Sequence, residues 1–295
     1  MKVSKIKTDE EMELLKNTTV TKGMIKQIIN DDAEIYTESG ELLLKFKKNV
    51  LTDGQDFYKN VKPFMDKHPS TNRGSVSGGL KMNVKDNPKI KTSILGYFDK
   101  WSPKQKFLFK KLGMKVPIEV RETMYNVDEE EKYKLIVPFI KQIDGLYKKY
   151  IPDKYKKQRK KADETEFKIE GTAFTTVTTN INFQTTIHKD VGDDEDGFGN
   201  LSVIEHGSYE GGETCFPQYG IGVNVREGDI LLMNVHEWHG NLPIKFKGKN
   251  VERLSVVCYL RKNIWLRTKN KTKKYRDKHN KTLRDLRGKL KRLGL

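Results

Sequence analysis

The chain has 295 residues, enough for one large domain or two modest ones, each with a buried core. Its two cysteines, Cys215 and Cys258, exclude both a disulfide framework and a cysteine-rich zinc site. No apolar run has the length needed to cross a bilayer, and the N-terminus lacks the apolar stretch of a secretory signal. We therefore expect an intracellular protein in a reducing compartment, with no membrane partner.

Positive charge is concentrated at the C-terminal end. The formal net charge is +17, and the segment from Arg261 to Leu295 contributes +13 of it, which leaves +4 for the rest of the chain. Such a segment would release counterions from a polyphosphate and so give affinity without reading bases. The alternative is a solvated tail that only aids solubility.

The N-terminal 60 residues form a mixed lead-in with a predicted hairpin. Segments 34–37 and 41–46 have strand composition and flank a turn at Glu38-Ser39-Gly40. Residues 70–79, rich in Ser, Asn and Gly, are typical of a loop. This loop contains Arg73, and it either lines a site or is an ordinary surface connection.

A helical region is followed by a strand-rich region. Apolar residues between 128 and 150 recur at three- and four-residue steps, which predicts an amphipathic helix, and Pro138 predicts a kink or two shorter helices. Residues 148–161 hold eight basic residues and predict a second exposed helix or a linker. From about 167 to 260, Thr-, Val- and Gly-rich segments of strand length predict an antiparallel sandwich or barrel with helices packed outside, an α+β fold.

Candidate metal ligands lie at the ends of two predicted strands. His188 and Asp190 follow the strand-like segment 175–183, and residues two apart on a strand point to one face, so the pair can bind one ion. Both His236 and His239 follow the apolar strand 230–233, and either is a candidate third ligand. Two imidazoles and one carboxylate on iron leave half the coordination sphere open, as a non-haem oxygenase requires.

An arginine supports the same chemistry. A strand period over residues 253–260 puts Arg253, Ser255, Val257 and Tyr259 on one face. An inward guanidinium beside a hydroxyl is costly unless it pairs with an anion, and the distal carboxylate of 2-oxoglutarate is a natural guest for its planar fork. A salt bridge to one of the chain's own acids is the alternative.

With these residues in place, the chain resembles the Fe(II)/2-oxoglutarate dioxygenases, and within them the TET/JBP branch that oxidises the methyl group of a pyrimidine in nucleic acid. The likeness is strongest over residues 167–262, and segment 72–79 also resembles a glycine-rich stretch of that branch. The motifs that carry it are His188-Lys189-Asp190, Gly197-Phe198-Gly199-Asn200-Leu201, Tyr209-Glu210-Gly211-Gly212-Glu213-Thr214, Gly228-Asp229-Ile230-Leu231-Leu232, Trp238-His239-Gly240-Asn241 and Arg253-Leu254-Ser255.

The resemblance implies a double-stranded β-helix, or jelly roll, with flanking helices. It implies His188, Asp190 and His239 as ligands of Fe(II), because Pro243-Ile244 follows His239 as in these oxygenases, with His236 as the alternative. Arg253 and Ser255 would bind the cosubstrate 2-oxoglutarate, and O2 would complete the set. The carboxylate of Asp190 indicates hydroxylation, since related halogenases lack it.

The implied substrate is the 5-methyl group of thymine or 5-methylcytosine in DNA. A stacked base cannot reach the iron, so it must be flipped out. Arg73 and Asp194 are candidate substrate contacts, while the basic tail and residues 148–161 would hold phosphates, with Trp265 and Tyr275 as candidate stacking residues.

The chain then divides into a lead-in at 1–60, a dioxygenase domain at 61–262 with its jelly-roll core at about 167–262, and a basic helical tail at 263–295. Two alternatives stay open. One is an oxygenase of the same fold acting on prolyl or lysyl side chains of proteins. The other is a basic nucleic-acid-binding protein, without activity, whose His-x-Asp is accidental.

Overall fold

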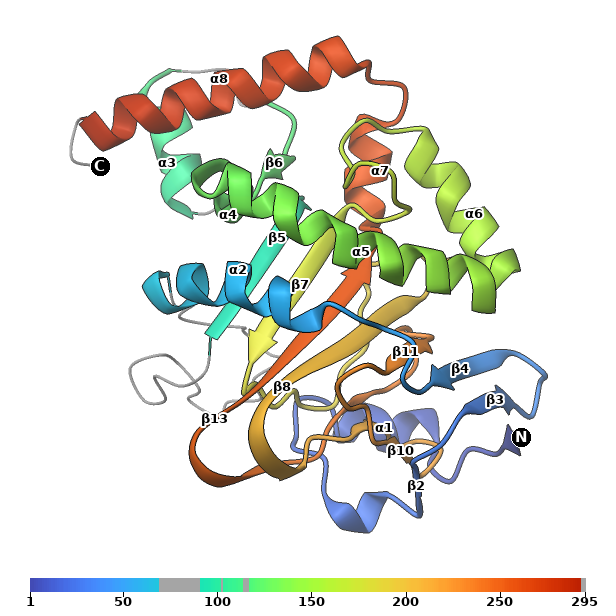
Figure 1. Ribbon diagram of the computed structural model, residues 1–295. Coiled ribbons are helices and arrows are strands. Elements are labelled where there is room, and N and C mark those ends of the chain that lie inside the picture. Colours follow the sequence, from blue (N-terminus) through green and yellow to red (C-terminus); the bar gives the residue numbers. More distant parts are fainter. Residues whose placement is uncertain (69–90, 102, 114–116, 293–295) are drawn as a thin grey trace.

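The computed structural model describes residues 1–68, 91–101, 103–113 and 117–292, and it shows a mixed α+β architecture (Figure 1). Within these ranges the strands form a nine-stranded sheet, in the order β1-β3-β4-β11-β8-β13-β7-β5-β6, and a four-stranded sheet, in the order β12-β9-β10-β2. The strands are β1 (Lys2–Val3), β2 (Gln27–Ile29), β3 (Ala33–Thr37), β4 (Leu42–Lys47), β5 (Lys91–Phe98), β6 (Arg121–Glu122), β7 (Thr176–Ile181), β8 (Gly199–Gly211), β9 (Thr214–Phe216), β10 (Ile221–Val223), β11 (Ile230–Met233), β12 (Gly240–Asn241) and β13 (Ile244–Tyr259).

Helices cover one face of the large sheet (Figure 1). The buried residues of α2 and α5 pack in one cluster with apolar side chains of β7, β8, β11 and β13. Burial of this apolar face is the main term holding these layers together. The helices are α1 (Asp9–Leu14), η1 (Lys22–Met24), α2 (Gly54–Lys67), α3 (Pro103–Lys111), α4 (Met124–Asp128), α5 (Glu130–Tyr150), α6 (Pro152–Asp163), α7 (Lys262–Thr268) and α8 (Lys273–Arg292).

Residues 1–60 take part in both sheets. The predicted hairpin is present as β3 and β4, and β4 continues the large sheet by pairing antiparallel with β11. Strand β2 pairs parallel with β10 in the small sheet. These pairings connect segments that are nearly 200 residues apart, so the N-terminal strands support the sheets that hold the site.

In the helical region the structure rules out one of the two alternatives that Pro138 left open. Pro138 lies inside α5, and α5 is a single helix from Glu130 to Tyr150. The chain therefore does not divide into two shorter helices there. Residues 152–163 form the second helix, α6, in place of a linker. Among the described residues, no helix has both the length and the apolar content that crossing a membrane requires.

The basic C-terminal segment forms two helices packed on the body. His279 is buried on α8 and its Nε2 lies 2.7 Å from the backbone oxygen of Val120, which can only accept, so Nε2 carries the proton. Asn280 is also buried and donates to the Tyr97 hydroxyl over 3.1 Å. Because α8 contributes these buried contacts, it is part of the folded body, and it lies across the top of the view in Figure 1.

Candidate active site

The two histidines of the predicted triad face each other through an isolated backbone bridge. His188 and His239 each donate their backbone N–H to the other's carbonyl oxygen, both over 2.9 Å. Gly240 allows these two backbone segments to lie close together, because a Cβ at this position would lie 2.9 Å from the carbonyl oxygen of Thr186. Asp190 is fixed by its own N–H, which donates to the carbonyl oxygen of Val235 over 2.9 Å.

The ring orientations follow from the hydrogen bonds of the Nδ1 atoms. His188 Nδ1 lies 2.7 Å from the carbonyl oxygen of Thr186, and His239 Nδ1 lies 2.9 Å from that of Glu237. A carbonyl oxygen only accepts, so both Nδ1 atoms carry protons and both Nε2 atoms face the common centre. The Nε2 atoms lie 3.7 Å and 3.6 Å from the two oxygens of Asp190.

This arrangement fits a metal ion. One nitrogen from each imidazole and one oxygen of Asp190 lie within 4.8 Å of one another. Burial by itself would lower the pKa of His239, but its hydrogen bond and charge interaction with Asp190 outweigh burial and raise it. A metal ion bound by these three atoms would replace that proton. Backbone carbonyls that hold Nδ1–H are the outer contacts typical of metal-binding histidines.

The alternative ligand, His236, points elsewhere. Its Nε2 lies 3.2 Å from the carbonyl oxygen of Asp194, and its side chain is absent from the group of possible ligands found among the described residues. His239 therefore completes the cluster. The choice between the two histidines depends on the turn between β11 and β12, which the sequence pattern does not determine.

Strand β13 shows the predicted alternation. Arg253, Ser255, Val257 and Tyr259 line the same cavity as the triad. The intervening Leu254, Val256 and Cys258 belong to the hydrophobic core on the other side. The two-residue period of a strand therefore places the arginine and the serine hydroxyl on the site's side of the sheet.

Arg253 carries donors that no group among the described residues accepts. The side chain is 3% exposed, and its Nε and Nη2 atoms are buried without a hydrogen-bond partner. Gly212 makes room for the guanidinium, since a Cβ there would come within 3.2 Å of Nε, and its φ of +76° favours glycine. Unpaired buried donors on a cation are costly, so they indicate a place for an anion. A carboxylate fits this place, as the 2-oxoglutarate prediction requires.

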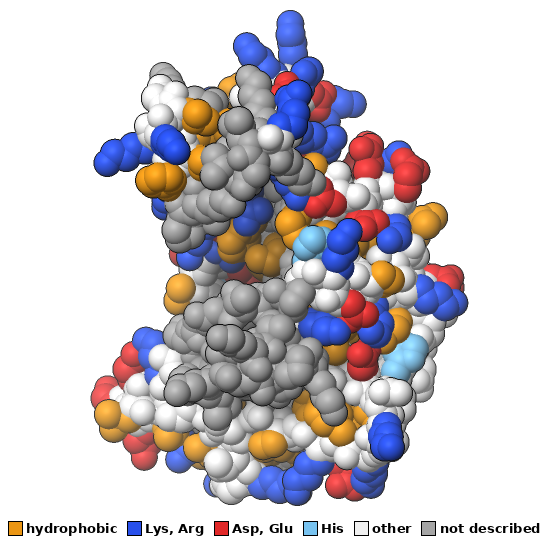
Figure 2. All heavy atoms as spheres, turned by 90° about the vertical axis from the view of Figure 1, so that its left-hand side faces the viewer, with side chains coloured by type: hydrophobic (Ala, Val, Ile, Leu, Met, Phe, Trp, Pro, Cys, Tyr) orange, Lys and Arg blue, Asp and Glu red, His pale blue; other side chains and the backbone are white. Residues whose placement is uncertain are grey.

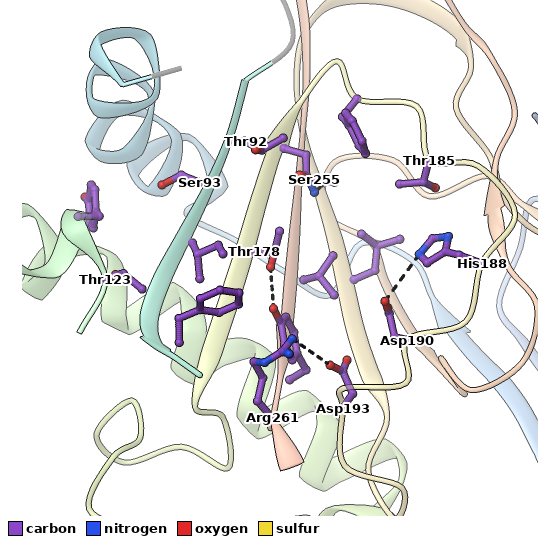
Figure 3. A pocket seen from close by; sticks show the side chains of 18 of the residues that line it. Thr92, Ser93, Thr123, Thr178, Thr185, His188, Asp190, Asp193, Ser255 and Arg261 are labelled. Atoms are coloured by element: carbon purple, nitrogen blue, oxygen red, sulfur yellow. Dashed lines mark hydrogen bonds and ion pairs between the residues drawn. The ribbon is translucent and has the colours of Figure 1, made fainter. Parts of the chain in front are cut away.

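The cavity that joins these groups has a volume of about 690 Å³ and lies between the two sheets. The triad and Arg253 line it together with Asn180 and Thr214. Figure 3 shows Asp190 directed toward His188, and it shows a second polar group, Arg261 and Asp193, at another part of the wall.

This second polar group combines the half-buried guanidinium of Arg261 with two buried carboxyl groups. Arg261 Nε lies 2.8 Å from Asp99 Oδ1, and its Nη1 lies 4.0 Å from Asp193 Oδ1. Burial and the neighbouring charge of Asp190 raise the pKa of Asp193 well above its usual value, although Arg261 opposes them. Beside it the hydroxyls of Tyr259 and Thr178 lie 2.8 Å apart. The group offers both hydrogen-bond donors and acceptors to a guest.

Two predicted substrate contacts have different outcomes. Arg73 lies outside the described residues. The carboxyl group of Asp194 points away from the cavity and forms an ion pair with Lys161, while its neighbour Asp193 lines the cavity. The sequence pointed to the acidic loop 193–196 but singled out Asp194 instead of Asp193, and it assigned Arg261 only to the basic segment. The signal available for both was their position, three residues after Asp190 and eight after Arg253.

The candidate stacking residues are engaged within the protein. Trp265 donates from Nε1 to Glu164 over 2.8 Å, and it packs against the main core cluster. The ring of Tyr275 stacks on that of His279 with centroids 6.1 Å apart. Neither residue lines the cavity found among the described residues.

Comparison with known proteins shows the family to which the chain belongs. Residues 107–262 match the family model described as the oxygenase domain of the 2OGFeDO superfamily, Tet_JBP. The chain belongs to this Tet_JBP family. Family membership argues against both an accidental His-x-Asp and a protein-directed hydroxylase. It also agrees with iron and 2-oxoglutarate as the groups that the triad and Arg253 accommodate.

Relatives and one solved structure extend the comparison. The chain is 30% identical over 191 residues to thymine dioxygenase JBP1 of Trypanosoma brucei brucei, which covers 64% of this chain and 20% of JBP1. It is 33% identical over 189 residues to the bifunctional helicase and thymine dioxygenase JBP2 of Leishmania infantum, covering 64% and 15%. The match thus spans about a fifth of these relatives. The solved structure of NgTET1 in complex with 5mC DNA has a TM-score of 0.54 at 15% identity, covering 87% of this chain and 90% of NgTET1, and it shows a shared fold.

Proposed function

We propose that this Tet_JBP protein is an Fe(II)- and 2-oxoglutarate-dependent dioxygenase that hydroxylates the 5-methyl group of a pyrimidine in DNA, with thymine as the first substrate to test. One observation carries the proposal. A three-ligand metal cluster and a buried arginine with unpaired donors line the same cavity. Thymine comes first because the JBP1 and JBP2 relatives are named thymine dioxygenases.

Each part of the site has a role in that reaction. His188, Asp190 and His239 would hold the iron on one side, which leaves positions for cosubstrate and oxygen. Arg253 and Ser255 would orient 2-oxoglutarate by its distal carboxylate. When bound, the iron and cosubstrate supply the oxidising power that removes a hydrogen atom from a methyl group, and the protein positions the reactants.

The Asp193–Arg261 group would contact the base. Asp193 offers an acceptor and Arg261 offers donors on one wall of the cavity. The pairing edge of thymine places the N3–H donor beside carbonyl acceptors, and that of 5-methylcytosine places the N4 amino donor beside the N3 acceptor. Either base therefore complements the pair. A base can reach this group only after leaving the duplex stack, so we also propose that the base is flipped.

We propose that the fold is a double-stranded β-helix closed by the N-terminal strands. The support is the arrangement of two sheets around one cavity, with antiparallel pairs β8–β13 and β7–β13 in the large sheet and β9–β10 in the small one. The backbone bridge between His188 and His239, which joins the segment after β7 to the segment before β12, also supports this fold.

A direct product assay tests the function. The purified protein is incubated with Fe(II), 2-oxoglutarate and oligonucleotides that carry thymine or 5-methylcytosine, and the digested nucleosides are identified by mass. We expect 5-hydroxymethyluracil from thymine, with none from Asp190→Asn, and 5-hydroxymethylcytosine if 5-methylcytosine is accepted. The absence of any oxidised nucleoside from the wild-type protein would refute the proposal.

A further inference from the structure

Three arginines and three lysines take opposite sides of the C-terminal helix α8. Its arginines at 276, 284 and 287 bind acids of the body, with N–O distances of 3.6 Å to Glu166, 2.8 Å to Glu122 and 2.5 Å to Asp128. They lie on the same side of α8 as the buried His279 and Asn280, because all five follow helical spacing. This side attaches the helix to the protein.

The lysines form a stripe on the other side of α8. Lys274, Lys278 and Lys281 follow each other at steps of four and three residues, and all three are exposed. Among the described residues, the one acid paired with this stripe is Asp285, which lies on the same helix, 2.7 Å from Lys281 Nζ. The stripe therefore presents positive charge to solvent and not to the body.

Two further cations lie at the wall of the active-site cavity. Lys100 and Arg121 both line it, and Arg121 donates from Nε to the backbone oxygen of Lys100 over 3.0 Å. Within the described ranges, neither has an acidic partner at ion-pair distance. Arg121 belongs to β6, against which α8 packs. Burial and the nearby charge of Arg287 lower the pKa of Arg121, so an anion beside it would be stabilising.

Lys100 and Arg121 line the cavity, and α8 packs against β6, the strand that contains Arg121. Figure 2 shows one face of the molecule hollowed at mid-height, with Lys and Arg side chains gathered in its upper part. In Figure 1 the same part contains β6, α3 and the C-terminal end of α8, whereas α6 lies on the opposite side. The stripe belongs to the first half of α8, so it lies farther from the hollow than β6 does. The basic residues of α6 are also partly neutralised, since Lys161 pairs with Asp194 and Arg159 with Asp163.

We propose that Lys100, Arg121 and the α8 stripe of Lys274, Lys278 and Lys281 form one cationic track that binds the backbone phosphates of the DNA strand whose base enters the cavity. The inference rests on the proposed function for its choice of DNA. The two cations at the cavity wall contact phosphates next to the flipped nucleotide. The stripe on α8 contacts phosphates farther along and supplies affinity without sequence preference.

Salt dependence measures the track directly. Each phosphate neutralised by a lysine or arginine contributes about 0.9 to the slope of log affinity against log salt concentration on duplex DNA. Replacing the three α8 lysines by glutamine should therefore lower the slope by up to about 2.7. The matched control is Lys148→Gln with Lys156→Gln and Lys160→Gln, which removes the same charge from exposed positions on and beside α6.

The experiment compares the full-length wild type, both triple variants, Arg121→Gln and Arg121→Lys. Binding of a fluorescent duplex is measured from 50 to 300 mM salt, and urea unfolding checks that each variant is folded. We expect the α8 triple variant to lose slope and affinity, and the α6 triple variant to match the wild type. Arg121→Gln should lower the slope by about 1, and Arg121→Lys should restore it.

Three results would overturn the track. They are a wild type that does not bind DNA, an α8 triple variant with unchanged slope, or an α6 triple variant that loses as much as the α8 variant. Binding is read without turnover, so failure of the track is distinct from failure of the proposed function. The latter would appear as a wild type that binds DNA with the expected slopes but forms no oxidised nucleoside.

Discussion

Replacing Arg253 by methionine should separate the effect of this arginine on folding stability from its contribution to binding 2-oxoglutarate. Its buried Nε and Nη2 atoms have no hydrogen-bond partner in the part of the chain that the structure describes, and a carboxylate would accept from both. A hydrogen bond that involves a charged group contributes about 1.5–3 kcal/mol, so losing two costs about 3–6 kcal/mol. At about 1.4 kcal/mol per tenfold, the dissociation constant for 2-oxoglutarate should rise roughly 10²- to 10⁴-fold.

The same substitution should not weaken the ligand-free fold. Methionine fills similar space without donors, and replacing an uncompensated buried cation by an apolar side chain is often neutral or stabilising. Arg253 is 3% exposed, so its guanidinium has little access to water. We therefore expect the free energy of unfolding of Arg253→Met to equal or exceed that of the wild type in the absence of 2-oxoglutarate.

Urea unfolding with and without 2-oxoglutarate measures both effects. At a ligand concentration one hundred times the dissociation constant, the wild type should gain about 2.7 kcal/mol, and the variant should gain almost nothing at the same concentration. Arg159→Met, on α6 and paired with Asp163, is the control and should keep the full gain. If Arg253→Met loses several kcal/mol without ligand and still binds 2-oxoglutarate normally, the arginine is structural and our reasoning is wrong.

Four further changes test other parts of the structure. Asp190→Asn should abolish iron-dependent release of succinate, measured with bound iron quantified in parallel; normal turnover would contradict the triad. Gly212→Ala should weaken 2-oxoglutarate binding in calorimetry, because its φ of +76° costs an alanine about 1–2 kcal/mol and its Cβ would come 3.2 Å from Arg253 Nε. Truncation after Lys269 should lower the urea midpoint, since it removes the buried contacts of α8, and an unchanged midpoint would show that α8 is not part of the fold. Burial lowers the pKa of His279 below 6.5, so its contribution to stability should be present above pH 6.5 and be lost as pH falls below it; His279→Gln should remove this dependence in unfolding curves.

Strand β13 shows how much of the site the sequence could predict. A period of two over residues 253–260 was enough to place Arg253, Ser255, Val257 and Tyr259 on one face, and all four line the cavity. The prediction worked because both faces of β13 are packed, so a shift by one residue would put the guanidinium into the core. Strand patterns are informative where burial on both sides fixes the register.

The sequence predicted less of the site in segments without regular secondary structure. The acidic run 193–196 offers no period, and only the structure shows that Asp193 lines the cavity while Asp194 pairs with Lys161. The choice of His239 over His236 likewise depends on a turn. Neighbouring residues in such segments have opposite roles because the backbone path, set by distant contacts such as that between Asp190 N–H and Val235, decides which side chain points inward.

The positive charge of the C-terminal segment was interpretable only after its partners were known. A count of charges treats Arg261 and Lys274 alike, yet one is half-buried and paired with Asp99 at the cavity, and the other faces solvent. The division has a chemical basis. The planar guanidinium fork binds carboxylates at fixed angles and is weakly hydrated, so it suits contacts that attach a helix, whereas the ammonium group of lysine stays hydrated and suits a surface that binds phosphates. Substitutions of the attaching arginines should therefore lower stability at every salt concentration, while those of the stripe should leave stability unchanged and lower the affinity for DNA and its salt dependence.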